Sequence, residues 1–320
     1  MKDAMKMRTE LHRHLDISLR METLLELAQE RGLEAESTSL QEFRKKIVIS
    51  RPMTDLSSVL ARFQIFQQVL DRPEVLERVA FEAMHDCAAE GTTQVELRFS
   101  PGFVCELSHL AWEDALDGFE SGMRRALRSL PEIRAGLICI ASREYGIEGV
   151  ERTIEFFLKH RDRFIGFDLA GNEVEFPSRK FEGAFRQLTA ADAKITIHAG
   201  EAAGPENIWE AIELLGARRI GHGVSAIRDP KLVELLVDRQ ICVECCPTSN
   251  WITGAVRSLE NHPLPLLLKA GVPVTINTDD PTVFGVDLPY ELDLCRKIMG
   301  FSTSDIEKCN VFAARASFLS

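Results

Sequence analysis

The sequence predicts an α/β protein whose fold is a (β/α)₈ barrel of the TIM type, with a helical insertion after the first strand. Three observations support this fold. The chain has 320 residues, and such barrels typically need roughly 250 or somewhat more. Short β-rich runs alternate with longer amphipathic runs, as βα units around a parallel sheet do. No linker and no GxGxxG motif interrupts this alternation, so we expect one domain over residues 1–320 rather than an open dinucleotide-binding sheet.

Eight candidate strands can be counted along the chain. Each is a short run of β-branched and apolar residues between longer helical patterns. Eight strands alternating with helices in one domain favour a closed barrel over an open doubly wound sheet. The expected strands are Arg8–His12, Gln94–Phe99, Ala135–Ala141, Phe164–Leu169, Lys194–His198, Arg218–Gly221, Ile241–Glu244 and Pro273–Asn277.

Apolar residues recur at helical spacing between the strands, and glycines follow two of these runs as stop signals. The segment Leu33–Leu70 is too long for a simple βα loop and contains a helical pattern of its own. Because this insertion follows the first strand, we expect it to lie over the barrel mouth, where function is usually carried. The expected outer helices include Thr23–Arg31, Val75–Glu90, Val150–His160 and Asn207–Leu215.

Composition narrows the class of protein. The formal net charge of -11 repels phosphate backbones, so we expect no nucleic-acid partner. No run approaches the roughly 20 apolar residues of a membrane helix, and the first residues lack the apolar core of a signal peptide. We therefore expect a soluble, cytoplasmic protein without a membrane partner.

The Cys242–Cys245 spacing has no second paired-Cys element beside it, which indicates buried thiols rather than a zinc ribbon.

Polar residues gather where four of the expected strands end. The first strand ends in HRH, and residues two apart on a strand point to the same side, so His12 and His14 aim at one place. HAGE ends the fifth strand, GHG the sixth and TDDP the eighth. All strands of a parallel barrel run the same way, so these clusters are expected to converge at its carboxyl-terminal face.

The converging residue types suit a metal ion. Asp279 and Asp280 are adjacent carboxylates, which repel one another unless a cation or hydrogen-bond donors offset their charge, and a divalent metal supplies that offset. Imidazole nitrogens together with one carboxylate suit zinc, with an open position for water. Zinc lowers the pKa of its water to about 7, and a free carboxylate such as Glu201 then shuttles protons.

At these residues the chain resembles the adenosine deaminase family, a branch of the amidohydrolase superfamily. Seven motifs occur in the family's order and span most of the chain, which is specific for this branch and less specific for the substrate. They are ELHRHLD (Glu10–Asp16), VELRFSP (Val95–Pro101), GFDLAGNE (Gly166–Glu173), HAGE (His198–Glu201), IGHG (Ile220–Gly223), CPTSN with TGA (Cys246–Ala255) and NTDDP (Asn277–Pro281).

The resemblance implies hydrolytic deamination of a 6-aminopurine nucleoside, with adenosine to inosine plus ammonia as the first choice and one zinc ion per subunit. Glu201 is implied to protonate the purine nitrogen next to the attacked carbon. His222 is implied to orient the attacking hydroxide and stabilise its charge. Asp280 is implied to hydrogen-bond that hydroxide and the leaving-group side, or purine N7. The implied metal ligands are His12, His14, His198 and Asp279.

The resemblance also implies how substrate is held. The backbone amide of Gly171 is implied to donate to purine N3, and Asp16 to bind a ribose hydroxyl. Four helically spaced apolar residues of the insertion are expected to form a lid beside the sugar. The implied substrate contacts are His14, Asp16, Gly171 and Asp280, and the lid residues are Leu56, Val59, Leu60 and Phe63.

One departure from the family pattern concerns the sugar side. The family usually has Gly after the acid of its first motif, whereas this chain has Ile17, which is bulky and restricts the backbone. The related enzymes that act on adenine often carry Glu at the position of Asp16, which favours a nucleoside here. No function is expected for the other histidines, which are His85, His109, His160 and His262.

Three alternatives remain open. The first is a deaminase of another aminopurine: adenine, a modified adenosine or 6-aminodeoxyfutalosine. The second is a two-metal esterase or phosphotriesterase of the same superfamily, which commonly needs a bridging Lys that DLAGNE lacks. The third is a catalytically silent nucleoside-binding protein, which is disfavoured because every expected ligand and the acid Glu201 are present. Sequence does not determine the oligomeric state.

Overall fold

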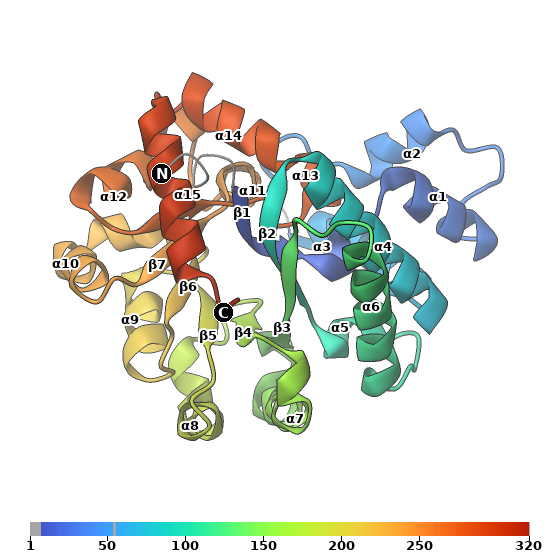
Figure 1. The fold of residues 1–320 in the computed structure, drawn as a ribbon, viewed down its shortest axis with the longest axis horizontal. Helices are drawn as coiled ribbons and strands as arrows, with labels where there is room; N and C mark the ends of the chain where they lie inside the picture. The colour runs from blue at the N-terminus through green and yellow to red at the C-terminus, as the bar shows by residue number, and fades with distance from the viewer. Residues whose placement is uncertain (1–7, 54–55, 320) are drawn as a thin grey trace.

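A parallel sheet of eight strands forms the centre of the molecule (Figure 1). This computed structural model describes residues 8–53 and 56–319, with the backbone alone for 56–61. Strand order follows chain order, and a bridge between Arg13 and Asp279 joins the last strand to the first, so the predicted barrel fold is confirmed. The strands are β1 (Arg8–His14), β2 (Thr92–Phe99), β3 (Arg134–Ser142), β4 (Gly166–Ala170), β5 (Ile195–Ala199), β6 (Arg219–His222), β7 (Cys242–Cys245) and β8 (Val274–Ile276).

All eight strands lie where the sequence predicts them, with ends that differ by a few residues. The largest functional difference is in β1, which continues to His14 instead of ending at His12. Its extension is held by closure of the barrel, because the N–H of His14 donates to the carbonyl of Asp279 at 2.9 Å, and Asp279 donates back to His12. The predicted fourth strand begins too early, since Phe164 precedes β4 as extended chain.

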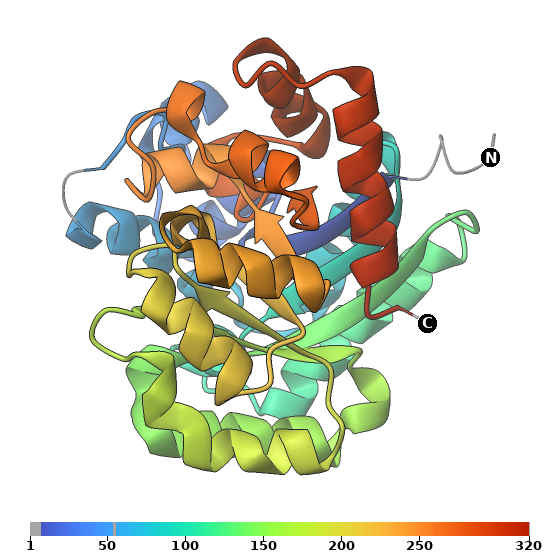
Figure 2. The same cartoon turned by 90° about the vertical axis from the view of Figure 1, so that its left-hand side faces the viewer.

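Helices surround the sheet, and Figure 2 shows them on the outside of the strands. The last helix, α15, packs against β8 and β1 and covers the seam of the barrel. The four helices expected from periodicity are present as α1, α4, α7 and α9. The helices are α1 (Met21–Glu30), α2 (Leu40–Ile47), α3 (Leu56–Val69), α4 (Pro73–Ala89), α5 (Pro101–Cys105), α6 (Trp112–Leu127), α7 (Gly146–Lys159), α8 (Glu182–Ala190), α9 (Pro205–Glu213), α10 (Pro230–Asp238), α11 (Pro247–Ile252), α12 (Leu264–Ala270), α13 (Pro281–Phe284), α14 (Leu288–Lys297) and α15 (Thr303–Ala316).

Helix α1 follows β1, the expected insertion Leu33–Leu70 contains α2 and α3, and Figure 1 shows α1 and α2 standing outside the ring of helices. The connection between α2 and α3 is tied to loops that follow two strands. Ile49 donates its N–H to the carbonyl of Val283 after β8, and Met53 donates to Ile252 after β7. Of the expected lid residues, Phe63 is half-buried against the core, while the side chains of Leu56, Val59 and Leu60 lie outside the described residues, so the lid remains a prediction.

The cysteines are uniformly internal. All eight thiols are free and buried, including Cys242 and Cys245 on β7, so the expectation of buried thiols at that spacing is confirmed. Within residues 8–53 and 56–319, no helix combines the length and the apolar character needed to cross a membrane.

Candidate active site

The four predicted metal ligands lie together at the carboxyl ends of the strands. His12 and His14 extend from the end of β1 to the same side, His198 comes from β5, and Asp279 follows β8. The Oδ1 atom of Asp279 lies 3.3 Å from Nε2 of His12 and 3.2 Å from Nε2 of His14. Nε2 of His14 lies 3.3 Å from Nε2 of His198. One donor atom from each of the four residues can be chosen so that all lie within 4.8 Å of one another.

These side chains fit a divalent cation. Nε2 of His12 is buried without a hydrogen-bond partner, although it faces the other three groups. Burial alone lowers the pKa of His14, but Asp280 and Asp279 outweigh burial and raise it to about 9, so the local field favours positive charge. Three imidazole nitrogens and one carboxylate oxygen form a donor set that suits zinc, and zinc can take an exchangeable ligand as a fifth.

Asp279 is held so that one oxygen faces the histidines. Its backbone has a left-handed φ of 63°, and its Oδ2 accepts a hydrogen bond from Oγ of Ser249 at 2.6 Å. Burial alone raises the pKa of Asp279, but the adjacent imidazoles of His12 and His14 outweigh burial and hold the pKa well below its ordinary value. The carboxylate is therefore ionised and oriented as a ligand must be.

Carboxylates bind the Nδ1 atoms of two of these imidazoles. Nδ1 of His12 lies 2.8 Å from Oε2 of Glu244, and Nδ1 of His198 lies 3.1 Å from Oδ1 of Asp168. Each carboxylate accepts the Nδ1 proton, which leaves the Nε2 lone pair of each ring directed into the cluster. One guanidinium joins the two carboxylates, since Arg98 donates to Asp168 at 2.7 Å and to Glu244 at 2.9 Å.

This charged layer continues into the barrel interior. Glu244 also forms an ion pair with Arg219 at 2.6 Å, and Arg219 pairs with Glu96 at 2.6 Å. Burial alone raises the pKa of Glu244, but Arg219 and Arg98 outweigh burial and hold it well below its ordinary value. The centre of the barrel is therefore ionised, while the apolar core lies between the sheet and the helices.

The predicted proton-transfer groups lie beside the metal-ligand cluster. Nε2 of His222, at the end of β6, lies 3.5 Å from Oε2 of Glu201, and Oε1 of Glu201 accepts a hydrogen bond from Oγ1 of Thr253 at 2.9 Å. Burial raises the pKa of Glu201. Burial and the adjacent Asp279 raise the pKa of Asp280, whose Oδ1 is buried without a partner.

A carboxylate that carried no predicted role holds the loop after β5. Glu173 is buried and accepts the backbone N–H groups of four successive residues, 200–203, at distances from 2.6 to 3.0 Å. Gly200 in this loop has a φ of +72°, and a Cβ there would lie 2.4 Å from Ile208. The loop shape that places Glu201 beside His222 is therefore set by Glu173.

We expect Glu173→Gln to lower kcat by roughly 10- to 100-fold, because small displacements of reacting groups are that costly. The amide retains one acceptor oxygen but turns N–H groups toward the backbone donors, so the loop carrying Glu201 must shift. Steady-state kinetics measure the effect, with Glu175→Gln, an exposed residue of the same loop, as the matched control. Equal kcat values for the two variants would contradict the assignment.

The substrate-side residues occupy two further loops. Asp16 is buried after β1; its Oδ2 accepts the N–H of Ser100 at 3.0 Å, while its Oδ1 has no partner. Burial raises the pKa of Asp16 to about 6. Gly171 follows β4 with a φ of +104°, and a Cβ there would lie 2.1 Å from Oε2 of Glu144. A φ of this sign and size strains any residue with a Cβ and favours glycine, and the predicted contact of its N–H with a purine remains a prediction.

Ile17, the residue that departs from the family pattern, lies in the interior of the protein. Its side chain is 3% exposed and belongs to the apolar core. Its bulk is accommodated by packing rather than by an open surface.

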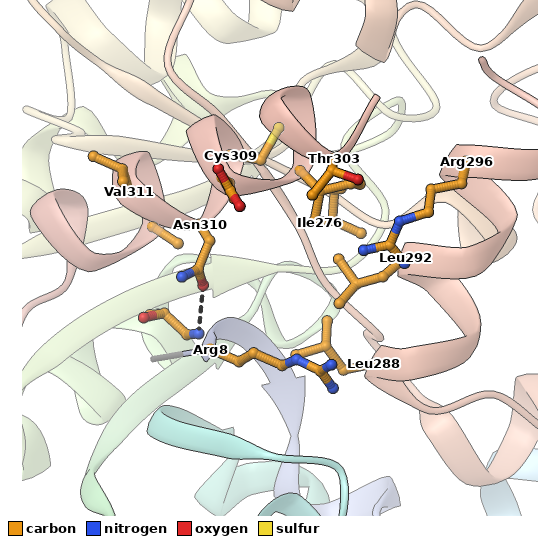
Figure 3. A pocket seen from close by; sticks show the side chains of 13 residues that line it. Arg8, Ile276, Leu288, Leu292, Arg296, Thr303, Cys309, Asn310 and Val311 are labelled. Carbon is orange, nitrogen blue, oxygen red and sulfur yellow. Dashed lines mark hydrogen bonds between the residues drawn. The ribbon is translucent and has the colours of Figure 1, made fainter. Parts of the chain in front are cut away.

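A separate cavity of about 270 Å³ lies between the start of β1 and the helices α14 and α15 (Figure 3). Its lining is mostly apolar, with Arg8 and Arg296 at its edge, and Asn310 accepts the N–H of Thr9 at 2.9 Å. Among the described residues that line it, none belongs to the predicted site. This cavity is therefore distinct from the candidate active site.

A model of the adenosine deaminase family matches residues 7–320. The chain belongs to the adenosine deaminase family. Its members are hydrolases that act on C–N bonds of cyclic amidines, and this chain is an enzyme of that class. The chain is 40% identical over 312 residues to an adenosine deaminase from Escherichia coli strain SMS-3-5 / SECEC, covering 98% of this chain and 93% of that protein.

Two solved structures of similar proteins extend the family comparison. An adenine deaminase from Arthrobacter aurescens aligns with a TM-score of 0.90 at 27% identity, covering 98% of this chain and 94% of that one. An amidohydrolase from Burkholderia ambifaria with bound zinc aligns with a TM-score of 0.88 at 25% identity, covering 99% and 87%. The proteins that this chain resembles therefore include enzymes named for a nucleoside and for a free base.

Sequence reasoning missed several residues of this site. Arg98, Asp168 and Glu173 lie inside the recognised motifs VELRFSP and GFDLAGNE, and Glu244 lies within β7. For Arg98, Asp168 and Glu244 the available signal was a charged residue within a buried strand, because such a residue needs a partner there. His262, for which no function was expected, is buried and hydrogen-bonded to Asn250.

Proposed function

We propose that this protein is a zinc-dependent deaminase that converts adenosine and water to inosine and ammonia. The observation that carries the proposal is the convergence of His12, His14, His198 and Asp279 beside Glu201 and His222. The four ligands would hold zinc, which supplies a Lewis acid that makes water nucleophilic at neutral pH. The zinc-containing relative supports the choice of metal.

The chain's own residues divide the remaining work. Burial raises the pKa of Glu201, which favours its protonated form. Glu201 donates this proton to N1 of the purine, so that the ring accepts electrons as C6 is attacked. His222 orients the attacking oxygen. Asp280, with an unpartnered Oδ1, accepts a hydrogen bond from the attacking water or the leaving-group side, or contacts purine N7. Each positioned proton transfer contributes about 10²- to 10⁴-fold.

Substrate positioning falls to the loops after β1 and β4. The N–H of Gly171 donates to purine N3, and Oδ1 of Asp16, which has no partner within the described residues, accepts from a ribose hydroxyl. An acceptor buried without a partner is costly until a donor reaches it. This observation supports a nucleoside over adenine, the substrate in the name of one structural relative.

The decisive experiment measures ammonia release by the purified, zinc-loaded protein from adenosine, 2′-deoxyadenosine, N6-methyladenosine, 6-aminodeoxyfutalosine and adenine. We expect the highest kcat/KM for adenosine, and loss of turnover after metal chelation with recovery on adding zinc. Faster turnover of adenine than of adenosine would instead identify the protein as an adenine deaminase. No ammonia from any of the five would refute deamination altogether.

A further inference from the structure

A line of three buried side chains lies behind His222, on the side away from Glu201. Nδ1 of His222 lies 2.9 Å from Nδ2 of Asn250 on α11, and Oδ1 of Asn250 lies 3.2 Å from Nε2 of His262. Nδ1 of His262 lies 3.0 Å from the backbone nitrogen of Leu264 at the start of α12. All three side chains are at most 2% exposed, so water cannot substitute for these partners.

Two backbone N–H groups determine the direction of every hydrogen bond in this line. The N–H of Leu264 can only donate, so Nδ1 of His262 accepts and its single proton lies on Nε2. The N–H of Cys246 approaches Oδ1 of Asn250 at 3.4 Å, which orients the oxygen of the amide toward Cys246 and His262. The NH₂ group of Asn250 must then face His222.

Burial supports the neutral form of His262 that this direction requires. Burial, together with the nearby His222, lowers the pKa of His262 to about 3. A neutral imidazole with an accepting Nδ1 is a donor at Nε2. The only acceptor that Nε2 of His262 faces in the described structure is the oxygen of Asn250.

We infer that Asn250 and His262 are positioning residues that fix His222 as the tautomer protonated on Nε2. Because Asn250 donates to Nδ1, that nitrogen keeps its lone pair and the proton resides on the opposite nitrogen. Nε2 of His222 is the atom that lies 3.5 Å from Oε2 of Glu201 and faces the reaction space. The ring therefore presents an N–H donor to the site.

This assignment rests on the proposed function for its chemical meaning. A neutral His222 with a proton on Nε2 has no lone pair there, so it orients and stabilises the attacking oxygen as a donor. The proton lost by the attacking water then passes to Asp280, whose unpartnered Oδ1 accepts a hydrogen bond from that water, instead of to His222. Exchanging the tautomer would turn a donor into an acceptor at the same place, without moving the ring.

The first test reads the tautomer directly. Zinc-loaded protein labelled with ¹⁵N-histidine is examined by NMR, and the His222 signals are identified by their loss in His222→Asn. We expect the proton of His222 on Nε2 and that of His262 also on Nε2. A proton on Nδ1 of His222 would overturn the inference. This readout needs no turnover, so it stands or fails independently of the proposed deamination.

The second test reverses the hydrogen bond. Asn250→Asp replaces the donor with an acceptor of the same shape, so the His222 proton should move to Nδ1. We expect kcat to fall by at least about 100-fold with little change in KM, because orientation in the transition state is lost rather than binding. Asn261→Asp, at an exposed neighbouring position, is the matched control. A wild-type kcat in Asn250→Asp would refute the relay.

A further pair of variants keeps the inference testable if Asn250→Asp fails to fold. His262→Leu removes the donor to Asn250 and is expected to lower kcat by about 10-fold or more, as changes behind a site residue do. His262→Gln retains a donor near Nε2 and should restore most of that loss. Equal rates in the two variants, with wild-type folding by circular dichroism, would show that His262 only fills space.

Discussion

Glu201→Gln is expected to lose turnover by about 10²- to 10⁴-fold, the usual contribution of a positioned proton donor, while retaining fold and zinc content. Gln has the shape of Glu and still accepts the hydrogen bond that Thr253 donates to Glu201, but it cannot protonate a purine nitrogen. Ammonia release and metal analysis measure the two effects. Glu206→Gln, an exposed change in the same segment, is the control, and near-normal turnover in Glu201→Gln would remove Glu201 from the mechanism.

The pH profile adds a second measure of the same residue. Burial raises the pKa of Glu201, while His222 partly opposes burial. The protonated form is the active one in this role, so kcat should decline as pH rises through the raised pKa. The residual rate of Glu201→Gln should lack this decline, because its amide does not titrate. An unchanged alkaline limb in the variant would assign that limb to another group.

Arg98→Met is expected to destabilise the fold by about 3–5 kcal/mol, the usual cost of removing one partner from a buried ion pair. Arg98 is fully buried, and its loss leaves Asp168 and Glu244 without the guanidinium that joins them. Chemical denaturation gives the change in the free energy of unfolding. Zinc affinity should also weaken by about 10- to 100-fold, because these carboxylates orient His12 and His198.

A surface arginine provides the control for Arg98→Met. Arg186 pairs with Glu182 one helical turn away, and its side chain is 76% exposed. Exposed pairs of this kind contribute roughly 0–1 kcal/mol, so Arg186→Met should unfold near the wild-type midpoint. Coincident unfolding curves for Arg98→Met and Arg186→Met would show that the interior charges are dispensable.

The sequence predicts those parts of the fold and site in which a local motif is enough to place a residue at one end of the barrel. Parallel strands in a barrel share one carboxyl-terminal face. The motifs HRH, HAGE and TDDP at strand ends therefore suffice to predict that His12, His198 and Asp279 lie close together. The predicted alternation of strands and helices is confirmed, because the sequence pattern of a buried β-rich run differs strongly from that of an amphipathic helix. The predicted ligand and catalytic roles of these residues remain predictions that the experiments above address.

Features that depend on tertiary partners were not accessible in this way. The end of β1 at His14 depends on hydrogen bonds with Asp279, more than 260 residues away. Glu173 acts on the loop after β5 only once the two loops are adjacent. His262 has the sequence context of an ordinary loop histidine, because its partner, Asn250, lies in helix α11. A pattern in one segment contains no record of such pairings.

Because all eight cysteines are buried, their reaction with a thiol reagent would reveal transient local unfolding of the native chain. A thiol reacts as the thiolate, and burial raises the pKa of Cys105 to about 12 and those of Cys245 and Cys246 well above their ordinary value. A small alkylating reagent should therefore modify the chain only when a segment opens transiently. Mass spectrometry of the order in which cysteines become labelled would then map which parts of the barrel open first, without any engineered probe.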